Sequence, residues 1–486
     1  MEVESKQPSL EDGDGDELRN EQFMLANDSN DTTWTKYLFL SSLLVASSAS
    51  FNFGYGIGSF GTKPLTTGGS QSYNFIDEYL PALFFTGSMA GFFTSALWYK
   101  FKFVNRKNIF FINYIFALIA ALLAIGYRYE ALSAISTLIH GYQGGMACDI
   151  VPTYLNEISP QKIRGKVNFL HQLFITIGIL TGQIVGIKQI LGSGDIWQYT
   201  YLIGAFPCFG AMFVIKYLPM SPIELVIRFK DRETARSLMC RLRGTEDVSA
   251  DMDLIDKEIE IKQNDTLQMG IRDVILSPYD RRQLIIIVSL LSVQALSGIN
   301  SIFFFANKIF DTLLDNQYAT RMTLGTGLVN VVATISGLYI VKVFGRRTLI
   351  LWSTVVISLC YVILTGLLSE WIVYFGETEK VFFVILILVL ISAFAVGLGP
   401  IPFMYAAEIT RPESRNAILN TCLVCNYIIN IMILFAMNIM IEKLKECIFM
   451  PFAFYLIAGN VLFFFKMPET RNKSITEIEK LFVKAV

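Results

Sequence analysis

Long apolar runs, separated by short polar loops, recur along most of the chain. A helix needs about 20 apolar residues to cross a bilayer. Runs of that length predict twelve spans, at 36–60, 79–101, 109–127, 131–155, 167–190, 197–218, 283–310, 321–343, 348–369, 380–405, 416–441 and 446–466. The pattern therefore indicates an all-α integral membrane protein that contacts the lipid bilayer directly.

Polar segments divide the twelve spans into two sets of six. The longest internal loop is rich in charged residues, and its stretches DRETARSLMCRLRG and DMDLIDKEIE have the pattern of short amphipathic helices. We predict an acidic disordered tail (1–33), a first half (34–218), a cytoplasmic loop with short helices (219–282), a second half (283–466) and a second cytoplasmic tail (467–486).

Lysine and arginine are distributed unevenly between the loops. Among the short loops, those after spans two, four, eight and ten hold most of them, and short loops rich in these residues stay in the cytoplasm. Both termini are therefore predicted to be cytoplasmic. On that side Asn27 and Asn30 would stay unglycosylated, although both lie in Asn-X-Ser/Thr sequences.

The two halves share a short motif at equivalent places. EISPQKIR follows span four, and EITRPESR follows span ten. Each motif comes after a helix that contains a proline, Pro152 or Pro402. Duplicated halves are typical of transporters in which the halves rock about a central site.

Uncharged polar side chains line one face of several spans. At the helical repeat, the stripes are Gln172, Thr176 and Gln183 on span five; Gln294, Ser297, Gly298, Ser301 and Lys308 on span seven; Thr323, Thr326, Gly327, Asn330 and Thr334 on span eight; and Cys422, Asn426 and Asn430 on span eleven. Asn300 joins the span-seven face only if the helix unwinds near Gly298. One such stripe is more typical of helix–helix contacts. Four stripes favour a shared wet cavity, and amides, which both donate and accept, suit a neutral polyhydroxylated ligand.

Glycine and proline predict irregular helices in two spans. GLGPIP (397–402) places Gly399, Pro400 and Pro402 in the middle of span ten, which predicts a break in that helix. The glycines of FGYGIG (53–58) are expected to loosen span one.

Together these stretches resemble the sugar porters of the major facilitator superfamily, nearest the facilitative hexose (glucose and fructose) transporters of animals. The matching stretches are PTYLNEISPQKIRG (152–165), HQLFITIGILTGQ (171–183), QALSGIN (294–300), GRR (345–347), GPIPFMYAAEITRPESR (399–415) and PETRNKSITEIEKLF (468–482). The resemblance covers nearly all of residues 36–482. It implies the major facilitator fold, with twelve transmembrane helices in two six-helix halves, and a place in the plasma membrane.

The resemblance also implies roles for particular residues. By position, the substrate-binding residues would be Gln172, Gln294, Asn300, Asn330, Phe403, Asn426 and Tyr427. A conformational charge network at the cytoplasmic helix ends would comprise Glu157, Arg164, Arg346, Arg347, Glu408 and Arg415. The basic loop that the family carries after span two reads KFKFVNRKN here, so Arg106 or Lys107 would have to substitute for it.

We therefore expect facilitative, uncoupled transport of a hexose or a similar small polyol by alternating access. No enzyme activity, cofactor or metal site is expected, and the net charge of −1 indicates no nucleic-acid partner. Gly56 and Thr137 stand where proton-coupled relatives carry an aspartate and an arginine. Two alternatives stay open: a proton-coupled sugar symporter, with Asp149 as its candidate carboxylate, and a non-transporting sugar sensor. Ala295 and Ala395 replace polar residues of the glucose carriers, which leaves the sugar itself open.

Overall fold

The computed structural model describes residues 34–62, 75–99, 104–126, 129–187, 189–192, 196–263, 269–306, 316–368 and 377–471, together with positions 101, 473 and 477. Throughout these residues the regular structure is helical, without a strand. The predicted first tail, with its two Asn-X-Ser/Thr sequences, and Lys308 lie outside the described residues, as does most of the second tail.

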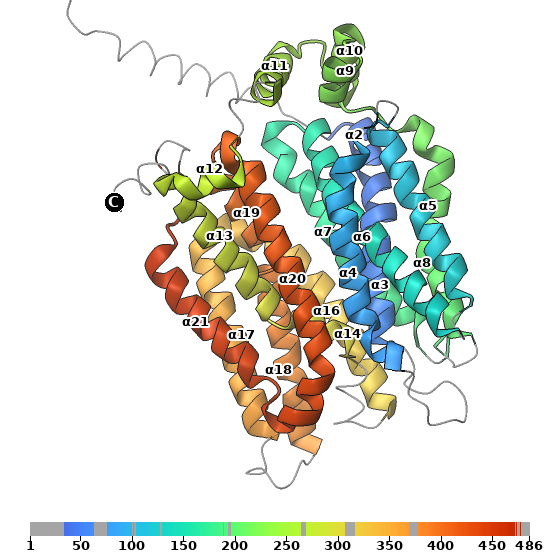
Figure 1. Cartoon of the computed structure of the whole chain (residues 1–486), viewed down its shortest axis with the longest axis vertical. Helices are drawn as coiled ribbons and strands as arrows, with labels where there is room; N and C mark the ends of the chain where they lie inside the picture. The colour runs from blue at the N-terminus through green and yellow to red at the C-terminus, as the bar shows by residue number, and fades with distance from the viewer. Residues whose placement is uncertain are drawn as a thin grey trace, which may run out of the picture.

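Two groups of long helices stand side by side (Figure 1). The first group consists of α2 (Lys36–Val45), η1 (Ala46–Ser50), α3 (Phe51–Gly61), α4 (Phe75–Trp98), α5 (Arg106–Ala124), α6 (Glu130–Ile158), α7 (Arg164–Val185), η3 (Trp197–Tyr199), α8 (Thr200–Val214) and η4 (Ile215–Tyr217). The second group consists of α13 (Pro278–Leu296), α14 (Ile299–Phe304), α16 (Asn316–Val343), α17 (Arg346–Leu368), α18 (Glu377–Val396), α19 (Ile401–Ile409), α20 (Pro412–Leu444) and α21 (Met450–Lys466). Consecutive pieces combine into the twelve predicted spans.

Hydropathy supports this assignment. Within the described ranges, nine helical segments are long and apolar enough to cross a membrane, by length and composition. Helix α21 is apolar but has only 17 residues. Helices α4 and α6 complete the twelve; α6 carries polar side chains such as His140, Gln143 and Asp149 along its length. The all-α membrane architecture predicted from the apolar runs is confirmed.

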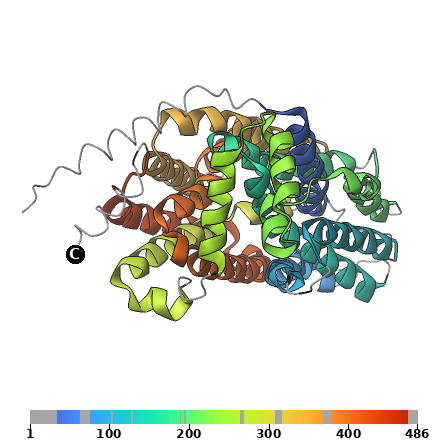
Figure 2. The same cartoon turned by 90° about the horizontal axis from the view of Figure 1, so that it is seen from above.

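The charged central loop folds into four short helices, which we call the cap. They are α9 (Pro222–Arg228), α10 (Arg232–Arg243), α11 (Ser249–Gln263) and α12 (Ile271–Leu276). Figure 1 shows the cap at one end of both groups, here named the cap end; the opposite end is the far end. Seen from above, the green helices of the cap lie over the middle of the molecule, whereas the yellow-green α12 lies nearer one edge (Figure 2). Helix α10 is tied to the first group, because Thr35 Oγ1 donates a hydrogen bond of 2.9 Å to the Leu242 carbonyl.

Buried apolar side chains form two clusters. One fills the first group and extends into the cap through Met239 and Leu242. The other fills the second group and reaches Phe60 and Phe84 of the first group. At the far end the Phe60 and Phe304 rings lie 5.6 Å apart, so the two groups are in direct apolar contact there.

Span one departs from the expectation that its glycines loosen it. A Cβ atom on Gly54 would lie 1.9 Å from the Ile175 carbonyl oxygen, and one on Gly58 would lie 2.0 Å from that of Ile179. The glycines therefore allow α3 and α7 to pack closely, and the prediction was wrong for this reason. The irregular part of the span lies earlier, where η1 forms a π-helical turn between α2 and α3.

Candidate functional site

Span seven unwinds inside the stretch QALSGIN. Helix α13 ends at Leu296, Gly298 adopts φ +72°, and α14 begins at Ile299. This left-handed backbone favours glycine, and a Cβ atom on Gly298 would also lie 2.9 Å from the Phe452 ring. The Tyr361 hydroxyl supports the break by donating a hydrogen bond of 2.5 Å to the Ser297 carbonyl.

The break brings Asn300 into contact with the polar face of span eleven. Asn300 Nδ2 donates to Asn430 Oδ1 at 2.7 Å, and Asn430 Nδ2 donates to Asn426 Oδ1 at 3.1 Å. Asn426 Nδ2 in turn donates to Gln294 Oε1 at 3.4 Å. These four side chains, Gln294, Asn300, Asn426 and Asn430, form what we call the amide chain. It lies near the middle of its spans and carries no charge.

Gln294 also donates hydrogen bonds to backbone carbonyls at the predicted break in span ten. Helix α18 ends before this break and α19 begins after it, with Gly399 and Pro400 between them. Gln294 Nε2 donates to the carbonyl oxygens of Leu398 and Gly399, at 2.8 and 3.0 Å. Pro400 and Pro402 have no backbone N–H, so carbonyls near them need another donor. One side chain therefore joins the amide chain to the broken helix.

Two further predicted binding residues lie on α7 and α16, helices of different groups that pack along each other. Gln172 on α7 is half-buried, and Asn330 on α16 is buried. Within the described part of the chain, neither amide has a hydrogen-bond partner. Both therefore retain donors and acceptors for water or a ligand.

The two predicted aromatic residues lie in different surroundings. Phe403, near the start of α19, is 45% exposed. Tyr427 is buried, with its ring centroid 5.9 Å from Phe92 and 6.4 Å from Phe85 of α4. Tyr427 thus packs between the two groups of helices, and a ligand reaches its ring only when these contacts separate.

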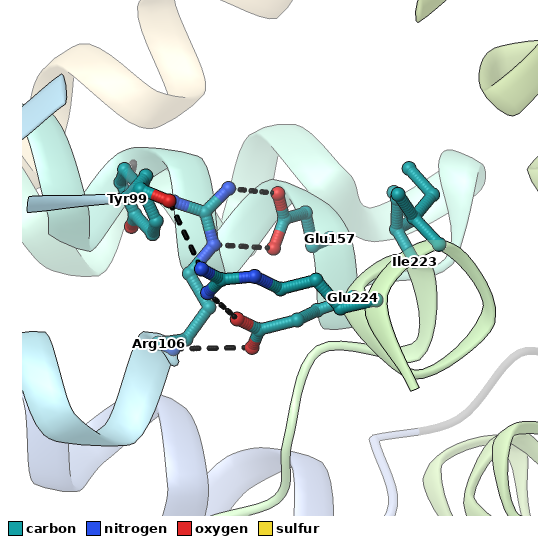
Figure 3. Close-up of a pocket in the computed structure, with 7 residues that line it drawn as sticks. Tyr99, Arg106, Glu157, Ile223 and Glu224 are labelled. Carbon is teal, nitrogen blue, oxygen red and sulfur yellow. Dashed lines mark hydrogen bonds and ion pairs between the residues drawn. The ribbon is translucent and has the colours of Figure 1, made fainter. Parts of the chain in front are cut away.

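A second set of polar contacts lies at the cap end. Arg106, the first residue of α5, forms an ion pair with Glu157 near the end of α6, in which Nε donates to Oε2 at 3.0 Å. The backbone N–H of Arg106 donates to Glu224 Oε2 at 3.1 Å. Figure 3 shows Arg106 beside both carboxylates. Of the two substitutes considered from the sequence, Arg106 is therefore the one that pairs with Glu157.

The second group repeats this arrangement. Arg346, the first residue of α17, donates from Nε to Glu408 Oε1 at 3.1 Å and from its backbone N–H to Glu469 Oε1 at 2.9 Å. Thr470 Oγ1 completes the set by donating to Glu408 Oε2 at 2.5 Å. In both groups, a glutamate from outside the bundle accepts an N–H at a helix start, where the helix dipole favours an anion.

The other predicted network residues occupy separate positions. Arg347 donates from its backbone N–H to Glu469 Oε2 at 3.1 Å and from Nη2 to the Phe464 carbonyl at 2.6 Å. Arg415 donates to the Thr410 hydroxyl at 3.2 Å, at the end of α19. Arg164 is exposed in the first turn of α7. The Arg106–Glu157 and Arg346–Glu408 ion pairs each join residues of one group.

A cavity of about 220 Å³ lies where the cap meets α5. It is lined by Tyr99, Arg106, Glu157, Ile223, Glu224, Ile227 and Arg228 (Figure 3). Arg228 Nη2 donates to the carbonyls of Tyr99 and Phe101, at 3.0 and 2.6 Å, and the Arg106 guanidinium lies 4.1 Å from the Tyr99 ring centroid. Because both arginines are already bonded within the protein, this cavity belongs to the joint between cap and bundle.

Glu224 offers a test of that joint by pH. Burial raises the pKa of the Glu224 carboxyl above its ordinary value of 4.5, although the Arg106 N–H and the guanidinium groups of Arg106 and Arg228 oppose this effect. With a raised folded-state pKa, the carboxyl contributes stability that is full below pH 4.5 and is lost as pH rises through the folded-state value. We expect Glu224→Gln to flatten this decline in the thermal unfolding midpoint. The exposed Glu246→Gln serves as control, and an unchanged slope in Glu224→Gln would contradict the prediction.

The chain matches the family model described as "Sugar (and other) transporter" over residues 42–482. It belongs to the sugar transporter family. Facilitated glucose transporter member 3 of rabbit (Oryctolagus cuniculus) is 31% identical to it over 473 residues, which cover 93% of each chain. Member 5 of the horse (Equus caballus) is 29% identical over 478 residues, again 93% of each.

Solved structures confirm the major facilitator fold for this sugar transporter. The xylose transporter XylE from E. coli, in its inward-open conformation, matches with a TM-score of 0.73 and 19% sequence identity. The match covers 91% of this chain and 99% of that one. At 19% identity, this structural match supports a shared fold and no further property.

Sequence reasoning about this sugar transporter missed three polar residues that the structure brings forward. Asn430 stood on a predicted stripe but was not assigned to the site, whereas it links Asn300 to Asn426. Glu224 and Glu469 were not assigned either. A signal for them was present, since a proline-containing stretch with a glutamate follows the last span of each half, PIEL at 222–225 and PETR at 468–471.

Proposed function

We propose that this sugar transporter carries a hexose or a similar small polyol by uncoupled alternating access. The cap end and both termini face the cytoplasm, in the plasma membrane. The amide chain carries the proposal, because it offers several donors and acceptors near mid-span without a charge. Such groups match sugar hydroxyls better than they match an ion. The names of the similar rabbit and horse proteins, facilitated glucose transporters, agree with passive transport.

The surroundings of Gly56 support the absence of proton coupling. A Cβ atom at this position would lie 2.9 Å from the His140 ring and 2.9 Å from the Phe84 ring. An aspartate side chain therefore has no room there unless these rings move. Asp149 on α6 remains a candidate carboxylate, and it accepts a hydrogen bond of 2.5 Å from Ser95 Oγ on α4. The structure of a D-xylose-proton symporter matches with a TM-score of 0.67 and 19% identity, which supports a shared fold and leaves coupling open.

Uptake of a panel of labelled sugars by the purified protein in liposomes tests the proposal. We expect at least one hexose or small polyol to equilibrate across the membrane, and never to exceed its outside concentration, whatever pH gradient is imposed. Accumulation that a protonophore collapses would instead establish a symporter, and its loss in Asp149→Asn would identify the coupling residue. Sugar binding without uptake would establish a sensor.

A further inference from the structure

Besides the contact of α3 with α14 at the far end, the two groups of helices meet along two seams of different chemistry. Helices α4 and α20 meet through aromatic rings, with Tyr79 and Phe435 5.5 Å apart and Phe92 and Tyr427 5.9 Å apart. Helices α7 and α16 instead meet where Gln183, of the stripe predicted for span five, bonds Thr326, of the stripe predicted for span eight. The second seam therefore includes a polar contact whose groups water can also satisfy.

Gln183 makes a polar contact across this second seam. Its Nε2 donates to Thr326 Oγ1 at 3.2 Å, and Thr326 Oγ1 itself donates to the Thr323 carbonyl at 2.6 Å. Gln183 and Thr326 are both 0% exposed. Gln183 Oε1 is buried and has no hydrogen-bond partner in the described part of the chain. Within the described residues, the Gln183 amide thus makes one neutral hydrogen bond and leaves one strong acceptor unsatisfied.

The position of Gln183 links this contact to closure of the far end. It lies in the last turns of α7, which ends at Val185. Close contacts between the groups at the same end include Gly61, where a Cβ atom would lie 2.2 Å from the Phe303 carbonyl oxygen. If the groups part at the far end, water can reach Gln183 and pair with both ends of its amide.

We propose that Gln183 is a self-limiting latch, which aligns the closed far end and at the same time favours its reopening. Closure exchanges water on both amide atoms for one neutral hydrogen bond, and an unpaired buried acceptor costs more than such a bond returns. The latch shifts the balance between the two facing states toward an open far end. The proposal rests on the proposed function only in requiring that the two groups rock.

Gly327 provides the room in which the latch closes. A Cβ atom on Gly327 would lie 2.1 Å from Gln183 Oε1 and 3.1 Å from the Leu180 Cα atom, which is backbone and cannot swing away. Gly325, on the same helix, has the Leu388 side chain as its nearest neighbour, at 3.9 Å. The pair offers a variant that obstructs the seam and a matched control that leaves it free.

Cysteine labelling measures opening of the far end without any sugar. Ala306 is 0% exposed and lies 3.7 Å from where a Cβ on Gly61 would be. An Ala306→Cys reporter, in a Cys447→Ser background that removes the exposed native thiol, is treated with a membrane-impermeant maleimide in proteoliposomes. Labelling, corrected for the parent without the reporter, should be about fivefold slower in Gln183→Leu, which removes the unpaired oxygen while Thr326 keeps its bond to Thr323. Gln183→Glu, which buries a charge on closure, should label faster by about the same factor.

Substitutions at Gly327 and Gly325 give a second test, in which Gln183 itself is unchanged. Gly327→Ala should speed labelling, because the seam no longer closes, and Gly325→Ala should label at the unmodified rate. Equal rates in Gln183→Leu, Gln183→Glu and the unmodified reporter would overturn the latch, as would faster labelling of Gln183→Leu. Failure of the unmodified protein to take up any sugar would overturn the proposed function and leave these rates to decide the latch separately.

Discussion

Replacing Gln294 with alanine should lower transport efficiency, the ratio of Vmax to KM, about 100-fold. The variant leaves the Leu398 and Gly399 carbonyls of the broken helix without their donor. Each unsatisfied buried group costs about 1–3 kcal/mol, and a lost sugar hydrogen bond adds about 1 kcal/mol. At the lower end of this range, the two carbonyls and the sugar hydrogen bond together cost about 3 kcal/mol. Since every 1.4 kcal/mol is a factor of about ten, this total corresponds to the expected loss.

Uptake into liposomes measures this loss, with two variants for comparison. Ser289→Ala changes the same helix, but its hydroxyl donates only to the Ile285 carbonyl one turn earlier, at 2.7 Å, so transport should stay near the unmodified level. Asn426→Ala interrupts the amide chain and leaves the span-ten break intact, and should cost about tenfold. If Gln294→Ala transports as well as Ser289→Ala, neither the amide chain nor the break it closes takes part in transport.

Three ion pairs should contribute to stability in the order of their burial. Glu157 and Arg106 have side-chain exposures of 6% and 15%, Glu408 and Arg346 of 27% and 20%, and Asp256 and Arg232 of 38% and 60%. Breaking a buried pair leaves an uncompensated charge, whereas an exposed charge is solvated. We expect Glu157→Ala to lower the free energy of unfolding by about 3 kcal/mol, Glu408→Ala by about 1 kcal/mol, and Asp256→Ala by less than about 0.5 kcal/mol.

Reversible denaturant titration in mixed micelles measures these free energies. Glu157→Gln keeps the shape and part of the hydrogen bonding of the side chain, so it should recover part of the loss seen in Glu157→Ala. Equal losses in all three alanine variants would show that burial does not set the strength of these pairs.

The spans could be predicted because their length and apolar character are imposed by the bilayer itself. The breaks in spans seven and ten were readable as well, since glycine and proline restrict the backbone locally. The role of Gly54 and Gly58 could not be predicted, because it depends on the close approach of α7, whose contacting residues lie more than 100 positions along the chain. A glycine in a helix has the same local signature whether it loosens the chain or admits a neighbour.

The polar stripes indicated which helix faces would be wet, and the amide chain lies on two of them. The sequence could not give the bonding order, because Asn430 meets Asn300 only after the backbone turns at Gly298. Tyr427 illustrates the same limit. Its place in the chain predicts an aromatic surface, whereas only the packing of α4 against α20 reveals that Phe85 and Phe92 cover it.

The hydrogen bonds that the start of α17 donates to Glu469, here called the clasp, have a practical consequence for reporter fusions. Glu469 follows the last span, yet its carboxylate receives the N–H groups of Arg346 and Arg347, and a Cβ atom on Gly345 would lie 2.1 Å from it. A fluorescent protein joined directly at Lys466 would delete this clasp and leave the start of α17 uncapped. A junction placed after Arg471, which bonds the Val343 carbonyl, would keep it. Brightness and trafficking measured with the shorter fusion would then describe a weakened second half, not the native protein.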